Sequence, residues 1–493
     1  MENKRKKINY IYFIIAVVVL GITVFAMVTA LGNTAGKHGF SLDDGWEKDR
    51  GNVYDRDSNP LVYSESVSDG NDDTKLVRKY DKVGAAYSNI IGFRTVFEAP
   101  VIDSEGNTVT NSDGTVRKTN IKRTEGVIEH NMAEWLVVGN KPGADIGGSY
   151  ILTTDSGLQK KCYDELVKFN KANKTTMAAA CVIDIQSGEI LAMTDTPGYD
   201  TQKVVDSATE EEFNKNIPAN SLYPFCTSSQ IPGSTFKIAT AAALCKLGYI
   251  DKEFDDSIPF KYNGTNGEVK NSDGAVHGLI GLADAIRYSS NVYFAMAAKA
   301  VDEDEKSGRE KLLEQYEELW KFNSEIKLDF CTLRPTLNLD NYQNLYNTPY
   351  GQGSCQISPL NICMITAAIA DGNFFKPYLI KDYLDCEGKL VASKSGKKEI
   401  ITKNVVSEEA QKCIRKGMEG VASRYGVNNA AVKTGTATLD GDKVNIWITG
   451  FYPKDNPRFA LTVSVFEASE DHYGSNLKDI ANHIFGYLND RNL

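Results

Sequence analysis

Ser234 and Lys237 stand three residues apart in 231-IPGSTFKIATAAALCKLGYI-250, between a Pro-Gly pair and an apolar run. If a helix starts at Ser234, both side chains lie on one face, with their roots about 5–6 Å apart. A serine hydroxyl is a weak nucleophile that needs a neighbouring base. A lysine can be that base only when desolvation or a second cation lowers its pKa. The spacing therefore predicts a serine nucleophile activated by a lysine.

A single S-x-x-K pattern is more often a helix cap beside a solvated lysine. The same pattern begins at three other positions, none followed by a long apolar helix: Ser324, Ser395 and Ser475. The helix behind Ser234 therefore favours this position over the others as the catalytic one.

A second motif lies in 288-YSSNVYFAMAAKA-300, which contains the triplet Ser289-Ser290-Asn291. A second serine hydroxyl can relay a proton between the lysine and a leaving group, and an asparagine amide can bind a substrate amide. The alternative is a loop that caps the helix beginning near Asn291.

The third motif is 433-KTGT-436, within the predicted strand AAVKTGTATL. Gly435 would allow a substrate backbone to approach the strand edge. Lys433 would bind a substrate carboxylate and, as a nearby like charge, lower the pKa of the first lysine. The backbone N–H groups of Ser234 and Thr436 could form an oxyanion hole. The alternative is a strand end with an exposed lysine.

The order S-x-x-K, S-x-N, K-T-G is typical of β-lactamases and penicillin-binding proteins. Over roughly residues 50–470 the chain resembles the class B, monofunctional penicillin-binding proteins, which are membrane-anchored peptidoglycan D,D-transpeptidases. Further stretches carry this resemblance: 50-RGNVYDR-56, 87-YSNIIGF-93, 152-LTTDSGLQ-159, 182-VIDIQSGEILAMTDTPGYD-200, 351-GQGSCQISPL-360 and 447-WITGFYP-453.

The resemblance implies that the penultimate D-alanine of a peptidoglycan stem peptide acylates Ser234 and that the terminal D-alanine leaves. Lys237 would be the general base, with Ser289 and Asn291 as proton relay and amide binder. An amine of a neighbouring stem would then attack the acyl-enzyme and form the cross-link. β-Lactam antibiotics would mimic the D-Ala-D-Ala end and trap the serine.

In the same family pattern, Lys433, Thr434 and Thr436 would grip the substrate carboxylate, and Gly435 would keep the strand open. No glycosyltransferase domain is visible. The resemblance therefore implies a partner that polymerises glycan, a polytopic membrane glycosyltransferase of the shape, elongation, division or sporulation type, docking on segment 9–150.

Three alternatives share parts of this chemistry. A serine β-lactamase or β-lactam sensor needs a base that activates water, and 318-ELWKFN-323 comes closest to E-x-x-L-N but has the wrong spacing. A non-catalytic wall scaffold would need none of the motif residues. A D,D-carboxypeptidase differs only in using water to resolve the acyl-enzyme, and the motifs do not decide that.

The elements that must position these motifs predict an α+β fold. A helix with Leu158, Cys162, Leu166 and Phe169 on one face precedes a β-hairpin at 178–195. Three strands follow at 430–467, the last alternating Leu461-Thr462-Val463 as a half-buried strand, and a helix at 475–490 ends the chain. We expect one antiparallel sheet built from both ends of the domain, flanked by helices, with an all-helical middle.

The N-terminus predicts a membrane anchor. MENKRKK is followed by an uncharged stretch from Ile8 to Gly36, long and apolar enough for a transmembrane helix. The flanking cations place the N-terminus in the cytoplasm and the remainder outside. A cleaved signal peptide ending at VTA (28–30) is the alternative, but the apolar core is long for one.

The domain limits follow from these signals. They are a cytoplasmic tail at 1–7, a transmembrane anchor at 8–31, a small β-rich extracytoplasmic pedestal at 32–149 and the transpeptidase domain at 150–493. Within the pedestal, 101–124 holds two turn signals between short β-prone pieces, which predicts a small region with hairpins.

Composition excludes some functions. The 493-residue chain carries a formal net charge of -10 and has no long basic block beyond its N-terminus, which argues against nucleic-acid binding. The nine cysteines are scattered singly and the five histidines do not cluster. We therefore expect no metal site and no cofactor.

Overall fold

The computed structural model of the protein describes residues 49–68, 74–139, 146–262, 267–304 and 307–491. The predicted cytoplasmic tail (1–7) and transmembrane anchor (8–31) lie outside these residues. Among the residues that are described, no helix combines the length and apolar character needed to cross a bilayer.

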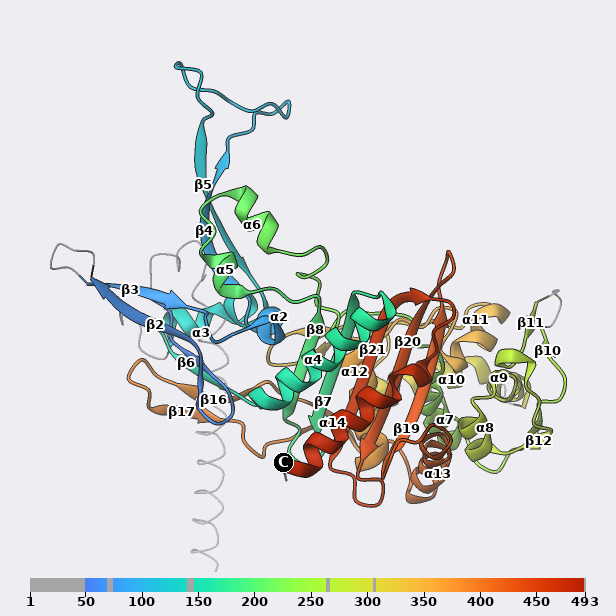
Figure 1. The fold of residues 1–493 in the computed structure, drawn as a ribbon. Helices are drawn as coiled ribbons and strands as arrows, with labels where there is room; N and C mark the ends of the chain where they lie inside the picture. The colour runs from blue at the N-terminus through green and yellow to red at the C-terminus, as the bar shows by residue number, and fades with distance from the viewer. Residues whose placement is uncertain (1–48, 69–73, 140–145, 263–266, 305–306, 492–493) are drawn as a thin grey trace, which may run out of the picture. The chain divides into compact units, whose positions relative to one another are not determined.

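The centre of the region that carries the three motifs is a five-stranded antiparallel sheet in the order β19-β20-β21-β7-β8 (Figure 1). Its strands are β7 (Met177–Asp184), β8 (Ile190–Thr196), β19 (Ala431–Thr438), β20 (Lys443–Tyr452) and β21 (Phe459–Ser469). The pairing of β21 with β7 joins the two ends of the domain. The predicted hairpin, the three late strands and their common sheet are thereby confirmed.

Helices cover both faces of this sheet (Figure 1). On one face, α4 (Ser156–Asn173) and α14 (Lys478–Arg491) pack on Leu461, Val463 and Val465. On the other, α12 (Pro359–Asp371) packs among residues such as Ala179, Cys181 and Ala460. Each face is apolar enough to bury a helix layer, as a two-sided core requires.

The prediction that β21 is half-buried was wrong. Thr462 and Ser464 are 0% exposed because they lie under α12. The hydroxyl of Thr449 makes a hydrogen bond of 2.7 Å with that of Thr462 and one of 2.6 Å with that of Thr366 on α12. Because these hydrogen bonds satisfy its hydroxyl, Thr462 can lie in a strand that is buried on both faces.

The helical part of the domain lies beside β19 (Figure 1). It consists of α7 (Lys237–Lys246), α8 (Leu282–Tyr288), α9 (Asn291–Asp304), α10 (Gly308–Trp320), α11 (Tyr342–Asn347) and α13 (Glu408–Tyr425). Every residue of α7 from Lys237 to Leu244 is buried, so this helix forms the core around which the others pack.

The expected all-helical middle was wrong in one respect, because short paired strands lie between the helices. They are β9 (Phe254–Asp255), β10 (Phe260–Lys261), β11 (Glu268–Val269), β12 (Leu279–Ile280), β13 (Ile326–Lys327), β14 (Thr332–Leu333), β15 (Phe374–Lys376) and β18 (Glu399–Thr402). The connections between helices are long and rich in turn residues, and they form these pairs because buried backbone groups need partners.

A six-stranded sheet combines strands from both sides of the predicted boundary at residue 149. Its order is β17 (Leu390–Ser393), β16 (Ile380–Leu384), β6 (Ser149–Leu152), β1 (Val53–Tyr54), β2 (Pro60–Ser68) and β3 (Thr74–Lys79). The strands before residue 149 (β1, β2 and β3) and those that follow (β6, β16 and β17) therefore share one backbone hydrogen-bond network.

The hairpin of β4 (Phe93–Pro100) and β5 (Lys118–Glu125) extends beyond α5 (Thr201–Val205) and α6 (Glu210–Asn216) (Figure 1). At its far end, Ile102 pairs with Thr108 and Thr110 with Val116. These two small turns confirm the predicted hairpins of 101–124. The short helices α2 (Ser88–Ile91) and α3 (Ala133–Val138) lie near its base.

A buried ion cluster fixes the RGNVYDR segment. Arg50 and Arg78 contact opposite oxygens of the Glu129 carboxylate at 2.5 and 2.6 Å, and Arg50 and Glu129 are at most 1% exposed. Arg78 also donates hydrogen bonds to the carbonyls of Arg50 and Gly51. A buried carboxylate shared by two guanidinium groups compensates charges that would otherwise be costly to bury.

Candidate active site

Ser234 lies in a 3₁₀ turn at Gly233–Phe236, and α7 begins at Lys237. The predicted helix therefore opens with a tight turn, and the two side chains still meet, with 2.8 Å between Lys237 Nζ and Ser234 Oγ. Lys237 is 0% exposed, whereas Ser234 is partly accessible. A nucleophile at the surface of the site thus contacts a base buried behind it.

Close backbone contacts hold this turn in place. Gly233 has φ 55°, and its N–H donates to the carbonyl of Gly351 at 2.9 Å. A Cβ on Gly351 would lie 1.9 Å from the Gly233 carbonyl oxygen, and a Cβ on Gly233 would lie 2.7 Å from the Thr436 carbonyl. Only glycine permits these approaches. The backbones at Gly233, Gly351 and Thr436 can therefore come together next to Ser234.

Ser289 lies between two lysines. Its Oγ is 3.2 Å from Lys237 Nζ and 2.9 Å from Lys433 Nζ. Its backbone is left-handed, with φ 59° and ψ 37°, where it ends α8 just before α9. Such a conformation costs a non-glycine residue on the order of 1 kcal/mol. This turn directs both the hydroxyl and the carbonyl of Ser289 toward Lys237.

The K-T-G motif lies on β19, the edge strand of the central sheet. Lys433 is 0% exposed and also donates to the Thr434 carbonyl at 2.8 Å. Thr434 and Thr436 are partly exposed, and Thr436 Oγ1 accepts a hydrogen bond from Gly474 N–H. The lysine is therefore buried, unlike the exposed lysine of the alternative interpretation.

Gly435 has a structural reason to be glycine besides any contact with a ligand. A Cβ there would lie 2.8 Å from the Pro232 carbonyl oxygen and 2.9 Å from the Thr235 nitrogen. The absence of a side chain thus lets β19 touch the turn that carries Ser234.

Burial and charge lower the pKa of both lysines. Burial holds the pKa of Lys237 well below its usual value, and the neighbouring Lys433 cation lowers it further. Burial, together with the charge of Arg424, lowers the pKa of Lys433 to about 7. Neutral Lys237 is the state that can accept a proton.

The contacts of Lys237 fit the neutral amine. Its Nζ lies 2.7 Å from the Ser289 carbonyl oxygen and 2.6 Å from Asn291 Oδ1. Both atoms accept hydrogen bonds only, so they take the two N–H groups of a neutral amine. The lone pair of the neutral amine is then left for the nearer of two hydroxyls, Ser234 Oγ at 2.8 Å against Ser289 Oγ at 3.2 Å. This is the arrangement a general base requires.

No carboxylate joins this network among the described residues: the hydrogen-bond partners of Ser234, Lys237 and Ser289 are hydroxyl, amide, amine and carbonyl groups. Glu318, in the segment closest to E-x-x-L-N, is exposed on α10, where its carboxylate contacts Gln315. It takes no part in the cluster.

The structure therefore brings the predicted residues together from three segments. Sequence reasoning missed two others. Gly351 was noted only as part of a family stretch, although the 351-GQG-353 pair indicates a tight turn. Asn271, which hydrogen-bonds to the backbone of Asn291, lies in an N-S-D-G sequence that indicates only a turn.

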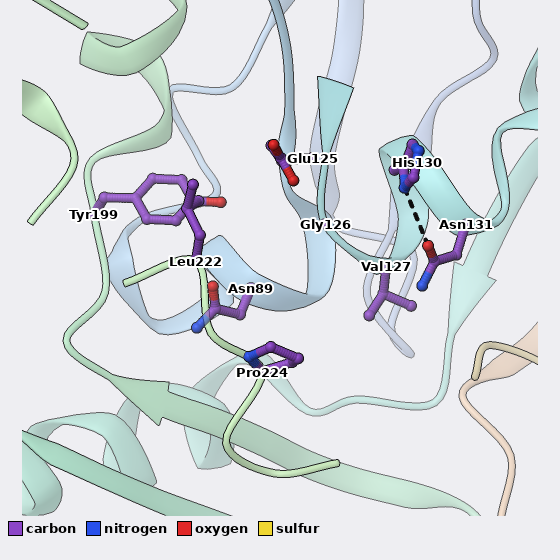
Figure 2. Close-up of a pocket in the computed structure, with 9 residues that line it drawn as sticks. All are labelled: Asn89, Glu125, Gly126, Val127, His130, Asn131, Tyr199, Leu222 and Pro224. Carbon is purple, nitrogen blue, oxygen red and sulfur yellow. Dashed lines mark hydrogen bonds between the residues drawn. The ribbon is translucent and has the colours of Figure 1, made fainter. Parts of the chain in front are cut away.

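A separate cavity of about 170 Å³ lies at the base of the β4–β5 hairpin (Figure 2). In its wall, Asn131 and His130 contact each other at 3.2 Å, and the Tyr199 hydroxyl donates to the Ser88 carbonyl. None of the predicted catalytic or substrate-binding residues lines it. It is distinct from the lysine–serine cluster.

Comparison with protein families gives a match to the penicillin-binding protein transpeptidase domain over residues 178–486. Stage V sporulation protein D of Bacillus subtilis is 28% identical over 336 residues, covering 64% of this chain and 49% of that protein. Penicillin-binding protein 3 of the same organism is 25% identical over 474 residues, covering 88% and 66%. The chain thus spans about half to two thirds of the length of these relatives.

Solved structures show the same fold. The D,D-transpeptidase domain of a peptidoglycan glycosyltransferase from Eggerthella lenta aligns with a TM-score of 0.69 at 22% identity, over 90% of this chain and 99% of that one. Penicillin-binding protein A from M. tuberculosis, as a ceftriaxone acyl-enzyme complex, aligns with a TM-score of 0.70 at 19% identity, over 90% and 99%. At these identities the likeness establishes the fold.

Proposed function

The chain belongs to the penicillin-binding protein transpeptidase family, and from this we propose that it is a membrane-anchored serine D,D-transpeptidase that cross-links peptidoglycan stem peptides. One observation carries the proposal: the buried amines of Lys237 and Lys433 both contact the Ser289 hydroxyl, and Lys237 also contacts the Ser234 hydroxyl. A protein that only binds cell wall has no use for two desolvated amines at a serine.

The first half-reaction is acylation. Neutral Lys237 takes the Ser234 proton as Oγ attacks the carbonyl carbon of the penultimate D-alanine. The backbone N–H groups of Ser234 and Thr436 stabilise the oxyanion. The peptide bond then breaks, and the proton passes from Lys237 through Ser289 to the departing amine of the terminal D-alanine.

Substrate binding uses the other motif residues. Lys433, Thr434 and Thr436 bind the terminal carboxylate, and the proximity of opposite charge favours the cationic form of Lys433. One N–H of the Asn291 amide donates to the Lys270 carbonyl at 2.9 Å; the second donates to a substrate amide carbonyl. A stem-peptide amine then displaces Ser234 and forms the cross-link, and β-lactams enter the same site as D-Ala-D-Ala mimics.

The proposal includes location and partner. Residues 1–7 lie in the cytoplasm, 8–31 span the membrane, and the pedestal (32–149) and transpeptidase domain (150–493) lie outside. The uncharged stretch that follows the basic N-terminus supports this arrangement. A polytopic membrane glycosyltransferase supplies the glycan strands whose stems are joined.

Labelling with a fluorescent penicillin tests the chemistry. We expect a long-lived adduct on the peptide containing IPGSTFK, located at Ser234 by mass spectrometry. Ser234→Ala should lose the label, and the matched control Ser228→Ala, on the same loop, should keep it. Rapid turnover of a chromogenic cephalosporin would support a β-lactamase instead, and a parent protein that never labels would support a scaffold.

A second assay, with a D-Ala-D-Ala donor peptide, tests whether an amine or water accepts the acyl group from Ser234. Incorporation of an added D-amino acid or stem amine in place of the terminal D-alanine supports the transpeptidase. Release of the donor with water as the sole acceptor would assign a D,D-carboxypeptidase.

A further inference from the structure

The turn that carries Ser289 and Asn291 is held by a side chain outside the three motifs. Asn271 Oδ1 accepts hydrogen bonds from the N–H groups of Asn291 at 2.8 Å and Val292 at 3.2 Å, and from the Ser290 hydroxyl at 3.2 Å. Asn271 is 8% exposed. It therefore caps the first turn of α9 from a segment some twenty residues upstream.

A buried carboxylate sets the orientation of this cap. Asp256, 1% exposed, accepts a hydrogen bond from Asn271 Nδ2 at 2.8 Å, and the same Nδ2 donates to the Ala275 carbonyl at 2.9 Å. An amide presents an oxygen on one side and a nitrogen on the other. Because two acceptors bind the nitrogen, the oxygen must face the N–H groups of α9.

Asp256 is itself held on its other side. It accepts hydrogen bonds from the backbone N–H of His277 at 2.6 Å and contacts His277 Nδ1 at 2.7 Å. Burial raises the pKa of Asp256, but the hydrogen bonds from His277, Ser290 and Asn271 together outweigh burial and leave that pKa below its usual value. The His277 ring stacks on Tyr288, which directly precedes Ser289, with centroids 4.4 Å apart.

Residues 270 and 271 hold both the backbone and the side chain of Asn291. Asn271 fixes its backbone, and the adjacent Lys270 carbonyl accepts from its Nδ2. With Nδ2 held there, Asn291 Oδ1 points to Lys237 Nζ at 2.6 Å. That contact occupies one N–H of the neutral lysine and keeps its lone pair directed at Ser234.

We propose that Asp256 and Asn271 are positioning residues of the catalytic site: the carboxylate orients the amide, the amide sets the S-x-N turn, and the turn aligns Lys237 with the nucleophile. This inference rests on the proposed acylation of Ser234 and extends it. Both residues act through Asn291, which contacts Lys237 Nζ directly but shares ligand binding with Lys433, Thr434 and Thr436. Their larger effect therefore falls on the rate of acylation and the smaller one on ligand affinity.

Exchanging the two side chains tests the orientation. In Asp256→Asn the backbone N–H of His277 takes the oxygen of the new amide, which turns its nitrogen toward the Asn271 nitrogen. The Asn271 amide is then driven to turn over and present nitrogen to the N–H groups of α9. In Asn271→Asp two carboxylates face each other. The double variant Asp256→Asn/Asn271→Asp restores a donor–acceptor pair with reversed direction. It loses the hydrogen bond to the Ala275 carbonyl and the acceptor for His277 Nδ1, which contacts the same Asp256 oxygen as Asn271 does.

The assay is stopped-flow acylation of the full chain by a fluorescent penicillin, separating the dissociation constant from the acylation rate constant. Displacement of catalytic groups by about 1 Å can cost on the order of 100-fold in rate. We expect each single variant, and Asn271→Ala, to acylate about 10- to 100-fold more slowly with a dissociation constant within about threefold of the parent. The double variant should recover at least about tenfold.

Asn170→Ala is the matched control, because Asn170 is also buried and donates hydrogen bonds to the Thr176 carbonyl and the Thr196 hydroxyl. It should lose stability and acylate at the parent rate. If Asn271→Ala fails to fold, Asp256→Asn and the double variant decide the question.

Three results would overturn the inference. They are acylation by the single variants at the rate of Asn170→Ala, a change in dissociation constant alone, or a double variant no faster than either single one. A parent that does not label at Ser234 would refute the proposed function together with it. A parent that labels normally beside unaffected variants would refute the positioning role alone.

Discussion

Replacing Lys433 with methionine is expected to abolish acylation and yet stabilise the protein. Lys433 is 0% exposed, and its hydrogen-bond partners within the described part of the chain are the Ser289 hydroxyl and the Thr434 carbonyl, with no carboxylate among them. Methionine has a similar length and no charge. The substitution therefore removes a desolvated amine and leaves the space filled.

The size of the gain in stability follows from the pKa of Lys433, which is 10.5 in the unfolded chain and about 7 in the folded protein. Each pKa unit corresponds to about 1.4 kcal/mol, so well below pH 7 the folded state carries a penalty of about 5 kcal/mol. Between the two pKa values the unfolded chain binds a proton that the folded protein does not. Stability of the parent therefore rises with pH, as the penalty falls from about 4 kcal/mol at pH 7 to about 2 kcal/mol at pH 9.

Loss of the two hydrogen bonds to Lys433 offsets about 1 kcal/mol of this gain. Lys433→Met should therefore raise the free energy of unfolding by about 3 kcal/mol at pH 7 and about 1 kcal/mol at pH 9. Guanidinium unfolding followed by tryptophan fluorescence at both pH values measures the difference. Lys443→Met, which changes an exposed lysine next to the same edge strand, should stay within about 0.5 kcal/mol of the parent.

A Lys433→Met protein that is no more stable than the parent at pH 7, or a gain that does not shrink at pH 9, would refute the claim that burial sets the charge of this site.

The free protein should give a bell-shaped pH profile for acylation by penicillin, rising as Lys237 loses its proton and falling near pH 7 as Lys433 loses its own; a flat stopped-flow profile from about pH 5 to 9 would contradict this. Gly351→Ala would place a Cβ 1.9 Å from the Gly233 carbonyl oxygen, so the nucleophile turn must shift. Time courses of fluorescent labelling should then slow about 100-fold, and an unchanged rate would show that the turn tolerates the displacement. Glu129→Gln would leave two guanidinium groups without their shared carboxylate and should destabilise the fold by about 3–5 kcal/mol, read as a lowered midpoint in thermal unfolding; an unchanged midpoint would show that the cluster is not a stabilising contact.

Several elements could be predicted from short-range patterns. The hairpin at 178–195 and the strands at 430–467 are runs of apolar and β-branched residues separated by turn sequences. Leu158, Cys162 and Leu166 fall on one helical face and are indeed buried. The helix could be predicted because an amphipathic helix repeats its burial every 3.6 residues. The strands could be predicted because turn residues mark the ends of short apolar runs.

The same reasoning failed where a second layer of structure decides burial. Alternating threonine in β21 indicates a half-exposed strand, because a hydroxyl group ordinarily prefers water. In the folded protein, the Thr462 hydroxyl pairs with that of Thr449 on the neighbouring strand, and Thr449 pairs in turn with Thr366 on α12. Partners so distant in sequence leave no periodic signal.

The residue types and order of S-x-x-K, S-x-N and K-T-G determined which chemistry this chain could perform, because a serine nucleophile needs a base and a lysine can be that base only when its pKa is lowered. The tertiary structure decided that Lys237 and Lys433 are buried and share the Ser289 hydroxyl, and that Asp256 and Asn271 hold the turn between them. Burial and hydrogen-bond direction depend on how distant segments pack, so no single motif encodes the lowered pKa of its lysine.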